Sequence, residues 1–273
     1  MKKMLHTIGR IACVLISTLC LFSCGEYQQI LKSKDPDVKY QKALDYFNDK
    51  QYVKAQTLLD EVTPYYKSTD RAQDVLIYLS RSHMGQKNYP AAAEYYQAYI
   101  RNYPKGRYIM EARFQVGHCY YLDVADARLD QADTKKAIQF YIQFVEYHPD
   151  SPYAEQAYKE MNELYDRLAY KEFLSAKLYY NLGTYLGNNY LSAEIVAKNA
   201  LKTYPTNKYQ EELSWIVLQA KYQQTINSVD AKKQERAIDA NDEYYSFVTQ
   251  YPESKHLSAA KKIHKEIEAI LEN

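Results

Sequence analysis

The chain has 273 residues, with 35 Lys and Arg against 34 Asp and Glu, and it contains 31 tyrosines but only 7 glycines. This charge balance supplies no basic field for nucleic acid or other phosphate-rich partners. Scarce glycine also leaves few places for the tight turns of β-hairpins. The composition therefore favours a helical, elongated protein over a sheet.

The first element is an apolar segment with a basic start. Three basic residues within the first ten precede an apolar run that ends at Phe22, and this run is shorter than the roughly 20 residues of a membrane-spanning helix. Such a pattern is typical of a secretory signal peptide, here residues 1–23. The junction "LFSC" resembles the lipobox of bacterial lipoproteins, so we expect Cys24 to be the lipidation site.

The residues around Cys24 bear on where the anchor lies. Gly25 follows the cysteine, whereas an Asp there favours inner-membrane retention in enteric bacteria, so we expect the outer membrane and its periplasmic face. Surface exposure stays open as an alternative. Residues 24–34 would form a lipid-anchored linker. Removal of residues 1–23 leaves 32 Lys and Arg against 34 Asp and Glu, and only Cys24 and Cys119 as cysteines, so an intrachain disulfide is not expected.

A repeat follows the linker. Aromatic–proline pairs recur at 103–104, 148–149, 204–205 and 251–252. An alanine stands twelve residues before each proline, and a weaker copy begins earlier in the chain; these alanines are Ala55, Ala92, Ala137, Ala193 and Ala240. Aromatic and apolar residues continue the pattern at i+4, i+7 and i+8, which is one face of a helix. A second helical pattern begins after each proline, so the repeat unit is a pair of antiparallel helices.

These pairs resemble the tetratricopeptide repeat, as in "MGQKNYPAAAEYYQAYIRNYP". We expect an all-α fold, a tetratricopeptide-like α-solenoid of about five helix pairs with a capping helix at 254–272. Repeats one to three would occupy 35–150, and repeats four and five with the cap 151–273. The alanine spacings of 37, 45, 56 and 47 place an insertion before Ala137 and a long helix within 152–186. Asp35 and Ser151, each before a proline, should cap helices.

A more specific resemblance lies in the insertion and the long helix. Residues of the insertion resemble the R-D-Q-x-x-T-x-x-A stretch of the BamD family, the D-subunit lipoproteins of the β-barrel assembly machinery: Arg128, Asp130, Gln131, Thr134 and Ala137. The long helix contains that family's D-R-L-A as Asp166, Arg167, Leu168 and Ala169. Leu129 interrupts the first motif, and Leu182-Gly183 stands where the family has Arg-Gly.

The resemblance implies a periplasmic scaffold that binds unfolded β-barrel proteins and the barrel-forming subunit. Docking on that subunit would use the C-terminal repeats, with candidate residues Asp166, Arg167, Trp215 and Lys221. The groove side of the N-terminal repeats would bind peptide segments, through aromatic and sulfur-containing side chains suited to such contacts. The candidate groove residues are Tyr40, Phe47, Ile77, Arg81, Met84, Phe114, His118 and Tyr121.

Signals for catalysis are missing from the sequence. The histidines stand singly, and no metal, nucleotide or nucleophile motif occurs. We therefore predict that the protein is not an enzyme, takes no cofactor and contacts the membrane only through acylated Cys24. Two alternatives stay open: a periplasmic repeat adaptor for envelope division or peptidoglycan, and a surface glycan-binding lipoprotein for which exposed tyrosines would be suited.

Overall fold

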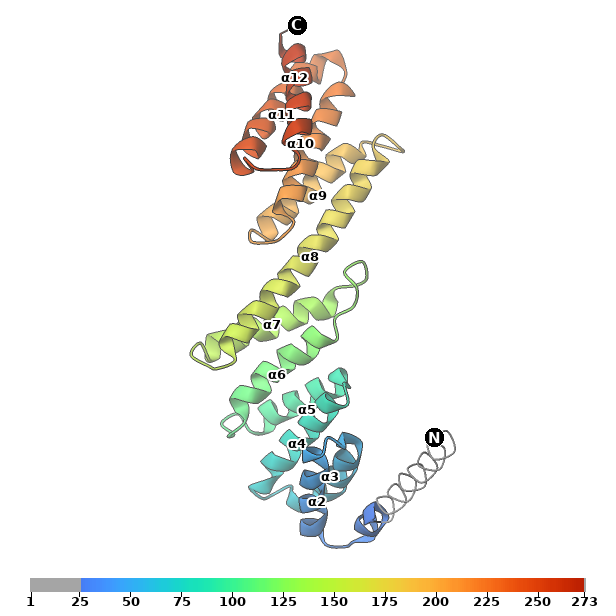
Figure 1. Ribbon diagram of the computed structural model, residues 1–273, viewed down its shortest axis with the longest axis vertical. Coiled ribbons are helices and arrows are strands. Elements are labelled where there is room, and N and C mark those ends of the chain that lie inside the picture. Colours follow the sequence, from blue (N-terminus) through green and yellow to red (C-terminus); the bar gives the residue numbers. More distant parts are fainter. Residues whose placement is uncertain (1–25, 273) are drawn as a thin grey trace, which may run out of the picture. The chain divides into compact units, whose positions relative to one another are not determined.

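The computed structural model describes residues 26–272, and this part of the chain is helical without any strand (Figure 1). Residues 1–23 and Cys24, the expected signal and lipidation site, lie outside the described residues. A helical segment at 26–32 precedes the remaining helices. These are α2 (Pro36–Asn48), α3 (Tyr52–Tyr66), α4 (Arg71–Gly85), α5 (Tyr89–Asn102), α6 (Ile109–Leu122), α7 (Ala132–Tyr147), α8 (Ala154–Leu182), α9 (Asn189–Thr203), α10 (Gln210–Ile226), α11 (Asp230–Gln250) and α12 (Leu257–Leu271).

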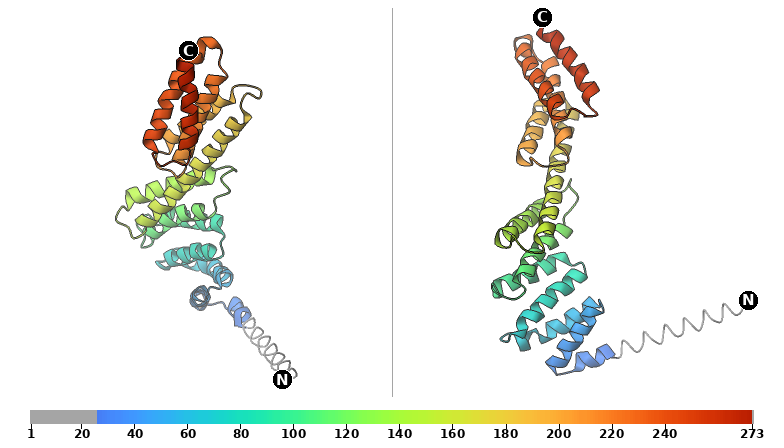
Figure 2. Two further views of the ribbon diagram at one scale, coloured as in Figure 1. Left: turned by 45° about the horizontal axis from the view of Figure 1, so that its top comes forward. Right: turned by 60° about the vertical axis from the view of Figure 1, so that its left-hand side comes forward.

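The helices from α2 to α11 form five successive pairs, and α12 packs on α11 as a single last helix. Most of these helices pack against their neighbours in the chain, as α2 on α3, α4 on α5 and α8 on α9. The all-α prediction of five pairs plus a capping helix is confirmed, and the arrangement is consistent with a tetratricopeptide-like α-solenoid. The long helix expected within 152–186 is α8, which runs uninterrupted for 29 residues (Figure 2).

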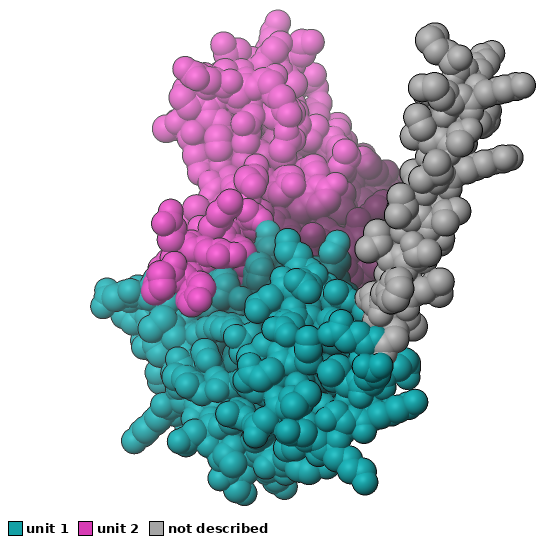
Figure 3. Space-filling view, turned by 60° about the horizontal axis from the view of Figure 1, so that its bottom comes forward, with its two compact units in different colours: residues 1–123, 142–151 teal, residues 124–141, 152–273 magenta. Residues whose placement is uncertain are grey.

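The chain divides into two compact units (Figure 3). In the described part, unit 1 comprises residues 26–123 and 142–151, and unit 2 comprises 124–141 and 152–272. The repeat register assigns residues 124–141 to the third repeat, but they group with the later helices. The reason is local bonding: the Tyr141 hydroxyl donates to the Glu160 carboxylate, and further side chains of α8 bind the insertion.

The repeat alanines lie in the buried stripe of the second helix of each pair. Five of them have no exposed surface at all: Ala55, Ala92, Ala137, Ala193 and Ala240. Residues four and seven positions further on are buried with them, as Tyr96 and Tyr99 are in α5. The predicted register therefore matches the stripe that each second helix turns towards its partner.

Of the two helix caps predicted from the sequence, the structure contains one, Asp35, and lacks the other, Ser151. The Asp35 carboxylate accepts hydrogen bonds from the backbone N–H groups of Asp37 and Val38, with Pro36 as the first residue of α2, so this cap is confirmed. Ser151 is not a helix cap, because its N–H closes a turn on the His148 carbonyl (3.1 Å) and α8 begins only at Ala154.

The crossing at Ala193 permits a stability test. Ala193→Leu places extra carbons against the buried alanines of the α8–α9–α10 cluster, and we expect it to destabilise the fold by about 1–3 kcal/mol. Ala259→Leu is the matched control, because Ala259 is exposed in α12 and leucine has nearly the helix propensity of alanine. Denaturant unfolding of both variants measures the difference. Equal unfolding free energies would show that this crossing is not tight.

Candidate functional site

The candidate groove residues lie on α2, α4 and α6, the first helices of the pairs in unit 1. Three of them are core residues, since Tyr40, Ile77 and Phe114 are only 6%, 0% and 2% exposed. Tyr40 meets the ring of Tyr66 edge-on at 5.7 Å, and Phe114 meets Phe144 at 5.6 Å. The expectation that these three line an open groove is wrong, because a neighbouring helix covers the face on which they lie.

The remaining groove candidates are half-buried: Phe47, Arg81, Met84, His118 and Tyr121. The Phe47 ring packs edge-on against Tyr52 at 5.5 Å and Tyr78 at 5.0 Å. The Met84 sulfur lies 3.9 Å from the Cys119 sulfur, and the His118 ring stacks between Phe114 and Tyr121. Each side chain is therefore held on one side and partly exposed on the other.

Arg81 is the centre of the contacts on this face. Its Nε and Nη2 atoms donate to the two carboxylate oxygens of Glu111, at 2.7 and 2.5 Å. The guanidinium also lies 5.2 Å from the ring centres of Tyr78 and Tyr108. Burial opposes the charge on Arg81, but the hydrogen bonds that Arg81 donates to Glu111, together with the charge of that carboxylate, outweigh burial and raise the pKa of the guanidinium. The cation is thus fixed in place between two tyrosines.

Four side chains on this face form a continuous row of contacts, in which Phe47 contacts Tyr78 and Arg81 contacts both Tyr78 and Tyr108. We call these four residues the Arg81 row. Tyr78 and Tyr108 were not among the candidates from the sequence. The missed signal was the i, i+3 spacing of Tyr78 and Arg81, which places both on one side of α4. A row of ring faces with a fixed guanidinium can pack on apolar side chains and donate to carbonyl or carboxylate oxygens.

The insertion loop, residues 124–131, is organised by a buried amide. Gln131 Nε2 donates to the carbonyl oxygens of Asp126, Leu129 and Asp130 at 2.9, 3.2 and 3.2 Å. Its Oε1 atom accepts from the Thr134 hydroxyl at 2.8 Å. The Gln and Thr of the first family-like motif therefore shape this loop and join it to α7.

Charged side chains of the insertion loop and α8 complete its attachment. Arg167 donates to the carbonyl oxygen of Ala125, and Lys171 Nζ donates to that of Leu129 at 2.8 Å. Within the loop, Arg128 donates to Asp126, and these bonds lower the pKa of that carboxyl to about 2. The loop is thus tied to the long helix at two points.

The docking candidate Asp166 holds the turn between α9 and α10. Its carboxylate accepts from the backbone N–H of Lys208 at 2.9 Å and pairs with the Lys208 ammonium at 2.9 Å. Asp166 and Arg167 therefore bond to other segments of the same chain, and they hold the α9–α10 turn and the insertion loop in position. The outward groups nearby are Arg128, whose side chain is 76% exposed, and Leu129, which is 60% exposed.

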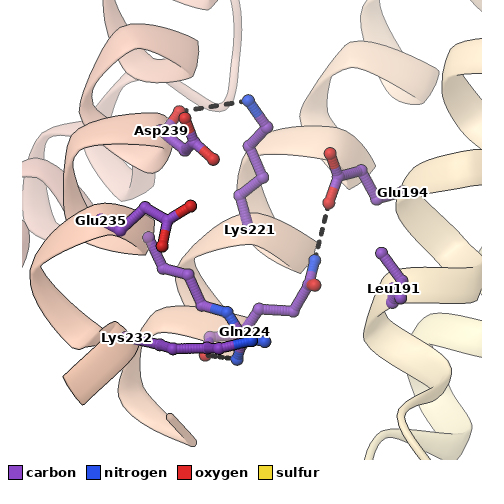
Figure 4. A pocket seen from close by; sticks show the side chains of 8 residues that line it. Leu191, Glu194, Lys221, Gln224, Lys232, Glu235 and Asp239 are labelled. Carbon is purple, nitrogen blue, oxygen red and sulfur yellow. Dashed lines mark hydrogen bonds between the residues drawn. The ribbon is translucent and has the colours of Figure 1, made fainter. Parts of the chain in front are cut away.

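The other two docking candidates lie on α10 and differ in exposure. Trp215 is 8% exposed, stacks on the His256 ring at 4.8 Å and contacts Phe247, so its expected role as a surface contact is wrong. Lys221 borders a polar cleft of about 300 Å³ between α9, α10 and α11 (Figure 4). Its ammonium donates to the Asp239 carbonyl at 3.1 Å and pairs with Glu243 at 3.0 Å.

Hydrogen bonds join several of the side chains that line this cleft, and charged side chains lie at its rim. Gln224 Nε2 donates to Glu194 at 2.7 Å (Figure 4). Arg236 donates to the backbone carbonyl oxygen of Gln224 at 3.2 Å. Lys232 and Glu235 also line the cleft and are exposed. Groups of both signs at the rim suit a polar partner segment better than an apolar one.

Among residues 26–272, no cluster of three or more His, Cys, Asp or Glu side chains could hold a metal ion. The same residues include no helix that is long and apolar enough to cross a membrane. Cys119 is 1% exposed, and burial raises the pKa of its thiol to about 12, which keeps it protonated.

One buried titratable group stands apart. His83 is 6% exposed, and neither ring nitrogen has a hydrogen-bond partner within the described chain. The ring stacks on Tyr95 at 4.8 Å. Burial lowers the pKa of His83 below its usual value of 6.5, although Asp60 opposes the shift. His83 is therefore protonated less readily in the folded chain than in the unfolded chain.

A test of the insertion loop follows from Gln131. Gln131→Leu keeps the side-chain size but removes the donor for three carbonyl groups, and we expect a loss of about 1–3 kcal/mol in stability. Hydrogen exchange should accelerate in residues 124–131 and stay unchanged in α10 and α11. Lys135→Gln, at an exposed position of α7, is the control. Unchanged exchange in the loop would contradict this role for Gln131.

The His83 side chain predicts a pH dependence. The free energy of unfolding should fall as the pH drops below about 6.5, by at most about 1.4 kcal/mol per pH unit. The reason is that the unfolded state binds more protons than the folded state in this pH range. His83→Phe keeps a ring against Tyr95 and should lose less stability between pH 7 and 5 than wild type. Above pH 7 the two unfolding free energies should change in parallel. Identical pH profiles across the whole range would contradict the prediction.

The helix pairs place the chain in a class, the all-α helical-repeat proteins. The sequence match gives its family, because residues 32–187 match YfiO, described as outer membrane lipoprotein, over more than half of the chain. The chain belongs to this family of BamD-like outer membrane lipoproteins. A search of curated proteins found none that matches it. The matched range includes the insertion loop and all of α8, which carry the two family-like motifs.

Proposed function

We propose that this protein is a lipid-anchored scaffold of the machinery that inserts β-barrel proteins into the outer membrane. Cys24 would carry the acyl chains, and the helix pairs would lie on the periplasmic face. The protein would bind unfolded barrel proteins and the barrel-forming subunit, and it would act by positioning them. The observation that carries the proposal is membership of the outer membrane lipoprotein family over residues 32–187.

The Arg81 row is the surface that we propose for unfolded barrel segments. Phe47 and the two tyrosines offer partly exposed rings, which bind apolar side chains with little loss of conformational entropy. Arg81 is held by Glu111 before any ligand arrives, so its remaining donors need no ordering on binding. An extended chain with alternating apolar residues, as in a barrel strand, fits both features.

Unit 2 offers a different chemistry, which we propose for the barrel-forming subunit. The insertion loop presents the exposed guanidinium of Arg128 beside the exposed Leu129 on a tightly bonded backbone. Asp166 and Arg167 would act by holding the α9–α10 turn and the loop in position. The charged rim of the cleft between α9 and α11 adds a second polar contact surface. A preformed loop loses little entropy on docking.

The proposal predicts that the two binding activities separate. Phe47→Ala and Tyr78→Ala should each weaken binding of an unfolded barrel protein by about 1–2 kcal/mol, roughly 5–30-fold in Kd. They should leave binding to the barrel-forming subunit unchanged. Arg128→Ala and Leu129→Ala should show the reverse pattern. Tyr65→Ala, an exposed tyrosine of α3 that does not belong to the row, controls for loss of any surface aromatic.

The measurement is a titration of each variant against both partners after its fold has been checked by circular dichroism. Equal losses for both partners, or none for either, would contradict the division between the two units. Failure of the wild-type protein to bind either partner would contradict the proposed function. Binding to peptidoglycan or glycan fragments instead would favour the corresponding alternative.

A further inference from the structure

The segment directly after the expected lipidation site is part of the first repeat. Residues 26–32, which the sequence pattern assigns to a linker, are helical. The Tyr27 ring meets Tyr46 of α2 edge-on, at 5.5 Å and 85°. Ile30 and Leu31 pack against the hydrophobic core shared by α2, α3 and α4. The segment is therefore docked by apolar contacts on the first helix pair.

Polar contacts reinforce this docking. Lys54 of α3 places its ammonium 5.4 Å from the Tyr27 ring centre and 5.0 Å from that of Tyr46. Glu26 accepts from the Lys42 ammonium at 3.0 Å. These contacts join the segment to α2 and α3. We call the three partly exposed side chains of this group, Tyr27, Lys42 and Lys54, the anchor-proximal patch; Tyr46 is buried beneath them.

The chain between Cys24 and this docked segment is very short. Only Gly25 separates Cys24 from Glu26, and two residues span at most about 7 Å when fully extended. A flexible linker of about ten residues would instead allow a mean separation of about 17 Å. Acyl chains on Cys24 would therefore hold the first helix pair without slack.

We propose that the anchor-proximal patch lies against the lipid headgroups of the leaflet that holds the Cys24 acyl chains. The inference rests on the proposed acylation of Cys24. The chemistry of the patch fits this place, because tyrosine rings and lysine side chains are favoured where an apolar layer meets water. The first repeat is then a membrane-apposed base, in place of the expectation from the sequence that acylated Cys24 is the only membrane contact, and the anchor orients this repeat in addition to retaining it.

Fluorescence quenching can test this arrangement on the full acylated protein. Asn48→Cys places a dye on the rim of the cleft that Glu26, Lys42 and Tyr46 line, and Asn102→Cys places one at the end of α5. Acylation consumes Cys24, and Cys119 is too deeply buried to be labelled. The protein is reconstituted in vesicles of phosphatidylethanolamine with some phosphatidylglycerol. A fraction of the lipid carries a nitroxide quencher on its headgroup.

Two insertions of the same flexible Gly-Ser sequence give matched variants. One lies between Gly25 and Glu26 and adds slack between the anchor and the docked segment. The other lies between Ser33 and Lys34, where it lengthens the connection to α2 but leaves the docking contacts in place. Tyr27→Ala combined with Leu31→Ala weakens the docking itself.

We expect strong quenching of the dye at position 48 and weaker quenching at position 102. The insertion after Gly25 should reduce quenching at position 48 to about half or less, since about ten flexible residues span roughly 17 Å. The insertion after Ser33 should leave it unchanged, and the double alanine variant combined with that insertion should reduce it.

Equal quenching in wild type and the Gly25 insertion would overturn the inference, and so would equal losses from both insertions. Failure of the wild-type protein to float with vesicles, together with an unmodified mass, would overturn the proposed acylation and the inference with it. Flotation and mass therefore separate failure of the anchor from failure of the docking.

Discussion

Close contact between paired helices at a buried alanine is the constraint on which every helix pair depends. Ala92 and Ala193 have no exposed surface, and their neighbours one and two turns further on are buried as well. A small residue lets two helices approach closely, so larger rings can interlock on either side of it. The spacing of each pair, and so the position of every surface residue, follows from this contact.

The abundance of tyrosine has a structural cause in the same crossings. Tyr99 is fully buried, yet its hydroxyl donates to Gln73 at 2.8 Å and accepts from the backbone N–H of Tyr108 at 3.0 Å. Tyr66 likewise donates to Asp37 at 2.6 Å. A tyrosine fills the core with its ring and joins neighbouring helices with its hydroxyl. Many tyrosines therefore serve packing, and those of the Arg81 row combine packing with partial exposure.

Most residues of the two family-like motifs bond to other parts of the chain. Gln131 and Thr134 shape the insertion loop, and Arg167 ties that loop to α8. Asp166 holds a turn 42 residues further along the chain through the Lys208 backbone. Their bonds support a surface whose exposed groups are Arg128, the first residue of the motif, and Leu129, the residue that interrupts it. A rigid backbone beneath exposed side chains is what a specific contact requires.

The sequence by itself determined the all-α class, the pairing of helices, the positions of the crossing alanines and the long helix α8, because helical periodicity and capping are local properties of the chain. It also determined the family. Exposure was decided only by the tertiary structure, since it depends on which side chains from distant segments cover a given face. Tyr40 and Ile77 share helix faces with partly exposed residues, and Trp215 is covered by His256 from 41 positions away. The docking of residues 26–32 on the first pair, and the bonds that occupy Asp166 and Arg167, likewise join groups that no sequence pattern places together.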